Sequence, residues 1–128
     1  DHLVPLALLR GRQRIRQERV GVLIFDSHLD LHPSPPAWAG SQWRTLIDEG
    51  YLLSEDLVIV GPRGVRQSRD EIAYARKNNV TVVPLQEVDE LGLTAVCEQI
   101  VDQFEPVDAV YVSLDIDVVD PSFCPAQK

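Results

Sequence analysis

The chain has 128 residues, of which 45% are hydrophobic and 25% are charged, a composition typical of a globular domain with a sizeable core. Its formal net charge of −8 argues against nucleic-acid binding, which normally needs a basic surface. The charge is compatible with a metal site or a cationic substrate, and equally with a solvated acidic surface. No stretch approaches the ~18 apolar residues of a membrane span, so we expect neither a membrane nor a nucleic acid as a partner.

The two cysteines, Cys97 and Cys124, have no paired spacing, which favours free thiols in a reducing compartment and predicts a cytoplasmic protein. The sequence contains no methionine and stops soon after a motif, without a closing element. We therefore expect residues 1–128 to be an internal fragment of a single domain, incomplete at both ends.

The first half of the chain predicts two helices around one strand. Residues 3–10 are rich in leucine and predict the start of a buried helix, and the basic stretch 10–16 predicts a solvated connector. Residues 20–25 form a continuous apolar run, typical of a central parallel strand that is buried on both faces. Three prolines predict a loop over residues 32–40, and a helix is expected over residues 41–50.

The second half alternates regularly between short apolar runs and helical patterns. The expected strands are residues 57–60, 80–83 and 109–114, and the expected helices are residues 69–78 and 93–104. This alternation predicts an α/β fold, in which helices cover both faces of a parallel sheet.

Two aspartate-rich motifs directly follow expected strands. Asp26, His28 and Asp30 come after the run 20–25, and Asp115 and Asp117 come after the run 109–114. Side chains at a spacing of two point the same way in an extended segment. Ligands of parallel α/β sheets bind beyond the carboxyl ends of the strands, so the two motifs are expected to form one site.

Four carboxylates cannot crowd together unpaired without a large cost, so either cations compensate their charge or they do not converge. Oxygen ligands with one imidazole and no thiolate suit manganese, magnesium or zinc. So many carboxylates exceed the needs of one ion, which predicts a two-metal site that generates hydroxide at neutral pH. Either motif alone is more typical of turn chemistry, and the metal interpretation depends on both occurring at strand ends.

The motifs resemble those of the ureohydrolase family, which includes arginase, agmatinase, formiminoglutamase and guanidino-acid hydrolases. Asp1-His2 corresponds to the second half of the family's Gly-Gly-Asp-His signature. The stretch Asp26 to Asp30 corresponds to Asp-Ala-His-x-Asp, and the stretch from Ser113 to Ala126 to a longer signature around Ser-x-Asp-x-Asp. With Gly64-Val65-Arg66 between them, the resemblance spans essentially the whole chain.

The resemblance implies a three-layer αβα sandwich with a parallel sheet, two Mn²⁺ ions and often a homo-oligomer. The family's metal ligands map onto His2, Asp26, His28, Asp30, Asp115 and Asp117. One ion would be held by His2, Asp26, Asp30 and Asp115, and the other by His28, Asp26, Asp115 and Asp117. Asp26 and Asp115 would bridge, and Asp30 would also orient the bridging hydroxide.

Three departures concern the substrate. Trp43 stands where many members have a histidine, and it is either a packing residue or an aromatic wall for the substrate. Arg69 stands near an acidic residue of arginases, and it either contacts a carboxylate of the substrate or is a surface residue at a helix start. His32 is expected to be a solvated loop histidine. The family glutamate that binds the guanidinium would follow Lys128.

The leading hypothesis is therefore a manganese-dependent hydrolase of linear C–N bonds in a small guanidino or amidine compound. A metal-bridging hydroxide would attack the central carbon of the substrate. The alternative is a catalytically inactive member that uses the metals for stability or acts as a partner subunit. The isolated fragment is itself expected to be inactive, because its sheet and pocket are incomplete.

Overall fold

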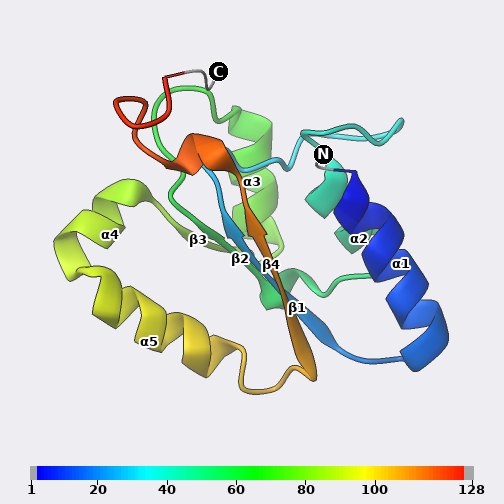
Figure 1. The fold of residues 1–128 in the computed structure, drawn as a ribbon. Coiled ribbons are helices and arrows are strands. Elements are labelled where there is room, and N and C mark those ends of the chain that lie inside the picture. The colour runs from blue at the N-terminus through cyan, green and yellow to red at the C-terminus, as the bar shows by residue number, and fades with distance from the viewer. Residues whose placement is uncertain (1–2, 126–128) are drawn as a thin grey trace.

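The computed structural model describes residues 3–125, and its centre is a sheet of four parallel strands in the order β3-β2-β1-β4 (Figure 1). The strands are β1 (Val20–Phe25), β2 (Leu57–Val60), β3 (Thr81–Val83) and β4 (Ala109–Leu114). Helices lie on both faces of this sheet, so the predicted three-layer α/β architecture is confirmed.

Three helices cover one face: α1 (Val4–Arg16), α2 (Gln42–Asp48) and α3 (Arg69–Lys77). The core on this side combines alternate strand residues with the apolar sides of the helices. Its fully buried members include Leu9, Val22, Ile24, Trp43, Leu46, Leu57, Ile59 and Ala75.

The other face is covered by α4 (Leu85–Leu91) and α5 (Leu93–Gln103), which lie together on the left of Figure 1. Val58 and Val60 of β2 pack here against Val96 and Ile100 of α5. Since neighbouring residues of a strand point to opposite faces, the continuous apolar runs in β1 and β2 supply both cores at once.

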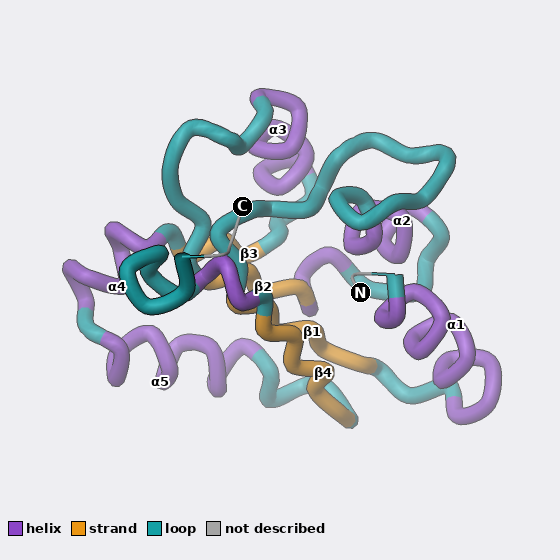
Figure 2. Tube along the Cα trace, turned by 45° about the horizontal axis from the view of Figure 1, so that its top comes forward, coloured by secondary structure: helices purple, strands orange, loops and turns teal. Residues whose placement is uncertain are grey.

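The order of the strands places a switch point between β1 and β4. The chain passes from β1 to β2 and β3 on one side, and then returns to add β4 on the other side of β1. Figure 2 brings the carboxyl ends of these strands toward the viewer. Phe25 and Leu114, the last residues of β1 and β4, are paired in register, so the loops that follow them start side by side. Such a switch point is where open α/β sheets bind ligands.

One expectation about the elements was wrong, and one helix was not predicted. The basic stretch 10–16 is not a connector but the second half of α1. Its guanidinium groups find carboxylates there: Arg10 lies 2.6 Å from Glu49, and Arg12 also pairs with Glu18. Helix α4 was not predicted, because its seven residues contain no fully buried side chain that would mark an apolar face.

Two short 3-10 turns, η1 (Ser54–Asp56) and η2 (Ile116–Val118), precede β2 and follow β4. None of the helices within residues 3–125 is both long and apolar enough to cross a membrane.

Candidate metal centre

The two aspartate loops begin where the hydrogen-bond pattern of the sheet ends. The amide of Asp26 donates to the Val60 carbonyl at 3.0 Å, and the amide of Asp115 donates to the Phe25 carbonyl at 2.8 Å. These bonds extend the pairing of β1 with β2 and of β4 with β1 by one residue. Because neighbouring strands hold both aspartates, the loops cannot diverge at their first residue.

Three of the expected ligands converge. One side-chain ligand atom each of Asp26, His28 and Asp117 lie within 4.8 Å of one another. The Nδ1 atom of His28 lies 2.9 Å from Oδ2 of Asp117 and 3.4 Å from Oδ1 of Asp26. The structure thus joins the first motif to the second, and these residues are three of the four ligands expected for one ion.

The electrostatics of Asp26 show that more carboxylates surround this cluster. Asp26 is 2% exposed, and burial together with the nearby carboxylates of Asp30, Asp117 and Asp115 raises its pKa to about 8. For Asp117, burial acts to raise the pKa, but hydrogen bonds from Ser27 and the charge of His28 outweigh it, so the pKa lies below its ordinary value. A bound cation would favour the ionised form of this buried carboxylate, because its positive charge offsets the nearby negative charges.

Asp30 and Asp115 lie beside the cluster rather than in it, as far as residues 3–125 extend. An oxygen of Asp115 accepts a 2.9 Å hydrogen bond from the Asp117 amide, which shapes the turn after β4. Asp30 has the left-handed backbone conformation, with φ of 52°, and its Oδ2 accepts a 2.8 Å bond from Nε2 of Gln42. His2, the sixth expected ligand, lies outside the described residues.

Gln42 was not recognised from the sequence, although it orients an expected ligand. Its side chain is fully buried at the start of α2. Its Oε1 atom is buried and has no hydrogen-bond partner within the described part of the chain. A buried acceptor without a hydrogen bond lowers the stability of the fold. The contribution of Gln42 is therefore the orientation of Asp30, and not stabilisation of the core.

Arg63, in the loop between β2 and α3, binds the backbone of the loop that follows β4. Its guanidinium donates to the carbonyls of Asp117 at 2.6 Å, Val118 at 2.8 Å and Val119 at 3.2 Å. The preceding Gly61 has φ of +99°, and a Cβ atom there would lie 2.7 Å from the side chain of Val118. The close approach of this loop to η2 therefore requires glycine.

Gln67 and Glu71 bind the backbone of the loop that follows β1. The side chain of Gln67 donates to the Ser27 carbonyl at 2.7 Å and accepts from the Leu29 amide at 3.1 Å. Glu71 forms a capping box with Ser68 at the start of α3, and its other oxygen accepts from the Leu31 amide at 3.1 Å. The spacing of Ser68 and Glu71 predicts the helix cap from the sequence. The hydrogen bond between Glu71 and the loop after β1 is visible only in the folded structure.

Trp43 and Arg69, the two residues considered for substrate binding, do not line the cavity that contains His28 and Asp30. Trp43 is 2% exposed and belongs to the hydrophobic core, with its ring centroid 6.5 Å from that of Tyr111, which favours the packing interpretation. Arg69 is the first residue of α3, exposed to solvent, which favours a surface role. His32 lies in the metal loop with Nε2 3.4 Å from Glu71.

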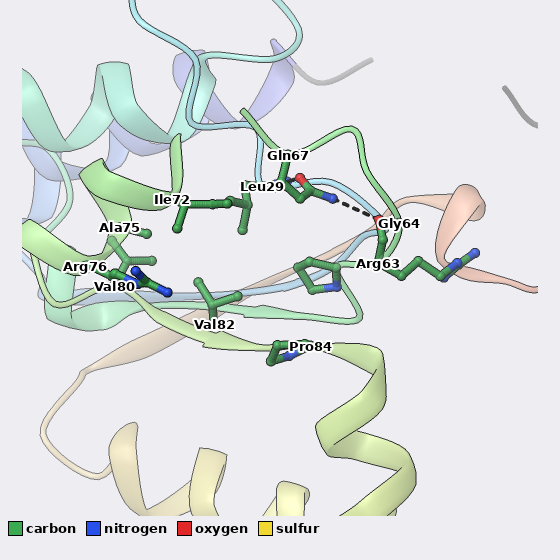
Figure 3. Close-up of a pocket in the computed structure, with 11 residues that line it drawn as sticks. Leu29, Arg63, Gly64, Gln67, Ile72, Ala75, Arg76, Val80, Val82 and Pro84 are labelled. Atoms are coloured by element: carbon green, nitrogen blue, oxygen red, sulfur yellow. Dashed lines mark hydrogen bonds between the residues drawn. The ribbon is translucent and has the colours of Figure 1, made fainter. Parts of the chain in front are cut away.

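Two cavities flank Gln67. Figure 3 shows an apolar one of about 470 Å³ between α3 and β3, into which Leu29, Ile72 and Val82 point. Its lining includes no carboxylate. The second cavity, of about 460 Å³, is lined by residues that include His28, Asp30, Trp38 and Arg66. Its contact with the expected metal ligands makes the second cavity the candidate substrate site.

The donor atoms fit a hard or borderline divalent cation. Carboxylate oxygens and one imidazole nitrogen converge, no thiolate is among them, and the buried Asp26 carries a raised pKa. The Nδ1 atom of His28 also lies 3.1 Å from the Ser27 hydroxyl, a partner that a cation would replace.

Comparison with known proteins agrees with this site. The family model "Arginase family" matches residues 1–127. The chain is 35% identical to guanidinopropionase of Pseudomonas aeruginosa over 98% of its length, 30% identical to an arginase of Bacillus subtilis over 98%, and 34% identical to formimidoylglutamase of Halalkalibacterium halodurans over 83%. It spans 40%, 47% and 34% of these proteins, respectively, which is less than half of each.

Solved structures show the same fold. Formimidoylglutamase of Bacillus subtilis superposes on 98% of the chain with a TM-score of 0.89 at 26% identity, and the chain covers 39% of it. Proclavaminate amidinohydrolase of Streptomyces clavuligerus superposes on 98% with a TM-score of 0.81 at 34% identity, and the chain covers 41% of it. The parallel sheet, the acidic cluster at its switch point and the match over nearly every residue together show that the chain belongs to the arginase family.

Proposed function

We propose that the full-length protein is a binuclear manganese hydrolase that cleaves linear C–N bonds in guanidino or amidine compounds. The observation that carries this proposal is the convergence of Asp26, His28 and Asp117 at the switch point of the sheet. The relatives support the reaction class, since they include a guanidinopropionase, arginases, formimidoylglutamases and a proclavaminate amidinohydrolase.

Four carboxylates in one site match the charge of two divalent cations. We assign His28, Asp26, Asp115 and Asp117 to one ion and His2, Asp26, Asp30 and Asp115 to the other, with Asp26 and Asp115 shared. When bound, the two ions would lower the pKa of a water molecule and so supply hydroxide as the nucleophile at neutral pH.

The chain's own residues would orient the reaction. Asp30, held by Gln42 through a 2.8 Å hydrogen bond, would orient the attacking hydroxide. Arg63 and Gln67 would keep the two loops in place by binding the carbonyls of Asp117 and Ser27. Preorganisation of this kind lowers the barrier because the donors need not move as charge develops.

The test is hydrolysis by the full-length protein of a panel of guanidino and formimino compounds, with release of urea and of formamide measured with and without Mn²⁺. We expect turnover that depends on the metal and that falls at least a hundredfold in Asp26→Ala and Asp115→Ala. Asp120→Ala is the matched control, because Asp120 is exposed and caps the nearby Ser122 amide at 2.7 Å. Unchanged turnover in the first two variants would contradict the proposal.

The non-catalytic alternative makes a different prediction. It requires full metal occupancy without turnover of any compound in the panel. The absence of a histidine at position 43 is the feature that favours it, and the panel assay combined with metal analysis separates the two functions.

We also propose that the protein is cytoplasmic, as its two cysteines without paired spacing suggest, and that it assembles into a homo-oligomer, as the family resemblance implies. Subcellular fractionation and light scattering of the full-length protein test these two points.

A further inference from the structure

Asp30 has an uncommon backbone conformation. Its φ of 52° lies in the left-handed region, which is unfavourable for a residue with a side chain, although aspartate adopts it more readily than most. Among the other non-glycine residues in the range 3–125, only Gln17 and Asn79 share this feature. Both lie just beyond the end of a helix, where the left-handed conformation is common. Asp30 lies in the loop between β1 and α2, so its surroundings must hold it in this conformation.

The two peptide groups that flank Asp30 are bound by side chains at the start of α3. The Leu29 amide donates to Oε1 of Gln67 at 3.1 Å, and the Leu31 amide donates to Oε1 of Glu71 at 3.1 Å. Residues on both sides of Asp30 are thus attached to one short segment, which fixes the direction of the chain where it passes through the left-handed residue.

Glu71 is held more firmly than an ordinary surface carboxylate. It is 2% exposed, and its Oε2 atom accepts from the amide of Ser68 at 3.0 Å and from the hydroxyl of Ser68 at 2.8 Å. Both oxygens therefore have partners, one in the helix cap and one in the loop after β1. A carboxylate also accepts stronger hydrogen bonds than a neutral amide oxygen does. The capping box of α3 thereby becomes a fixed attachment point for the Leu31 amide.

We propose that Glu71 is a positioning residue, whose hydrogen bond to the Leu31 amide keeps Asp30 in the left-handed conformation and directs its carboxylate toward the metal site. The inference rests on the proposed function, in which Asp30 binds one of the two ions and not the other. Loss of the Glu71 bond therefore weakens one ion, whereas the ion assigned to His28 and Asp117 keeps its ligands. A general loss of stability would weaken both ions.

The experiment is a titration of the metal-free full-length protein with Mn²⁺, in which the ions bound per chain are counted after equilibrium dialysis. Because Glu71 also lines the candidate substrate cavity, metal binding without substrate separates positioning from a direct contact with the substrate. We expect the wild type to bind two ions. Glu71→Ala should weaken one of them about tenfold or more, as for other residues that orient metal ligands, and should change the other by less than about threefold.

Glu71→Gln decides the question if Glu71→Ala does not fold. Its amide has one acceptor oxygen for the three donors that Glu71 now binds, so it should weaken the same ion by a smaller factor, about threefold or more. Unchanged binding of both ions in the Glu71 variants, or equal weakening of both, would overturn the inference.

Ser68→Ala is the matched control. It removes the hydroxyl of the capping box but leaves Oε1 of Glu71 able to accept from the Leu31 amide. We therefore expect a lower Tm together with wild-type affinity for both ions. Selective loss of one ion in Ser68→Ala as well would assign the effect to the helix cap and contradict the role of Glu71.

A double variant tests whether Glu71 acts through Asp30. Asp30→Asn should weaken the same ion, and adding Glu71→Ala to it should cause no further loss, because the carboxylate that Glu71 positions is already gone. Additive losses in the double variant would show that Glu71 acts on the metal site by another route.

A wild type that binds fewer than two ions would contradict the proposed function instead. Hydrogen exchange of the metal-free protein then still tests the inference. The Leu31 amide should exchange faster in Glu71→Ala and Glu71→Gln than in the wild type and in Ser68→Ala. Equal exchange in all four proteins would show that Glu71 does not hold this loop.

Discussion

His28 Nδ1 lies 2.9 Å from Oδ2 of Asp117, and this contact joins the loop after β1 to the loop after β4. The two residues are far apart in the chain but adjacent in space, because β1 and β4 are paired along their whole length. Four features of this centre and its surroundings lead to measurements on the full-length protein.

Asp26 predicts a pH-dependent stability of the metal-free protein. Burial and nearby carboxylates raise its pKa from 3.8 to about 8, so the folded state favours the protonated form. The stability contributed by that proton is complete below a pH of about 4 and is lost as the pH rises through 8. We expect the metal-free protein to have a lower Tm at pH 8 than at pH 6, and Mn²⁺ to raise the Tm more at pH 8. Differential scanning fluorimetry measures both effects.

The control variants separate Asp26 from the other acidic groups. Asp26→Asn should reduce both the pH difference and the stabilisation by Mn²⁺, because the amide neither ionises nor ligates as a carboxylate. Asp120→Asn should keep both, since Asp120 is exposed. Equal stabilisation of all three proteins by Mn²⁺ would show that Asp26 is not a ligand.

Gln42→Leu should weaken the metal site without weakening the fold. Leucine removes the donor to Asp30 and also removes the buried Oε1 that has no partner in the described chain, so the two effects on stability oppose each other. We expect a change in Tm of a few degrees at most, and a loss in manganese affinity or kcat on the order of 10–100-fold, as for other residues that orient metal ligands. Metal analysis and steady-state kinetics measure these quantities.

Gln86→Leu is the comparison for Gln42→Leu. Gln86 bonds to Glu90 on the exposed surface of α4, so its replacement should change neither metal content nor turnover. Wild-type manganese affinity and kcat in Gln42→Leu would contradict the orienting role.

Arg63→Gln should make the loop after β4, residues 115–119, more mobile. The variant loses hydrogen bonds from a charged donor to three carbonyls, each of which contributes on the order of 1 kcal/mol or more. Hydrogen exchange of residues 115–119 should become faster, and manganese affinity should fall. Arg76→Gln, beside the same apolar cavity, should change neither. Unchanged exchange in Arg63→Gln would show that the loop is held by other contacts.

The two tryptophans should respond in opposite ways. Trp43→Ala removes a fully buried ring and is expected to cost about 3–5 kcal/mol of folding free energy. Trp38 is 48% exposed and lines the substrate cavity, so Trp38→Ala should leave the Tm nearly unchanged and raise KM. Chemical denaturation and steady-state kinetics distinguish these outcomes. A raised KM in a stable Trp43→Ala protein would restore Trp43 as a substrate-facing residue.

Much of the fold follows from the sequence alone. The run 20–25 is apolar at every position, and a strand buried on both faces requires this pattern, so β1 was predicted with the observed bounds. The ends of the strands also placed Asp26 and Asp115 on the correct edge of the sheet, because the carboxyl ends of parallel strands share one edge. The local sequence pattern was sufficient in these cases because a strand that is buried on both faces needs an apolar residue at each position.

Other features depend on the tertiary structure. The order β3-β2-β1-β4 places Asp117 beside His28, and no local pattern encodes which strands pair. Gln42 and Arg63 belong to none of the aspartate motifs, and their contacts arise from atoms that distant elements bring close. The sequence by itself thus identified the candidate metal ligands and the strands that carry them. The packing of the helices and the pairing of the strands decided which side chains meet, because hydrogen bonds and ion pairs depend on distances that only the folded chain defines.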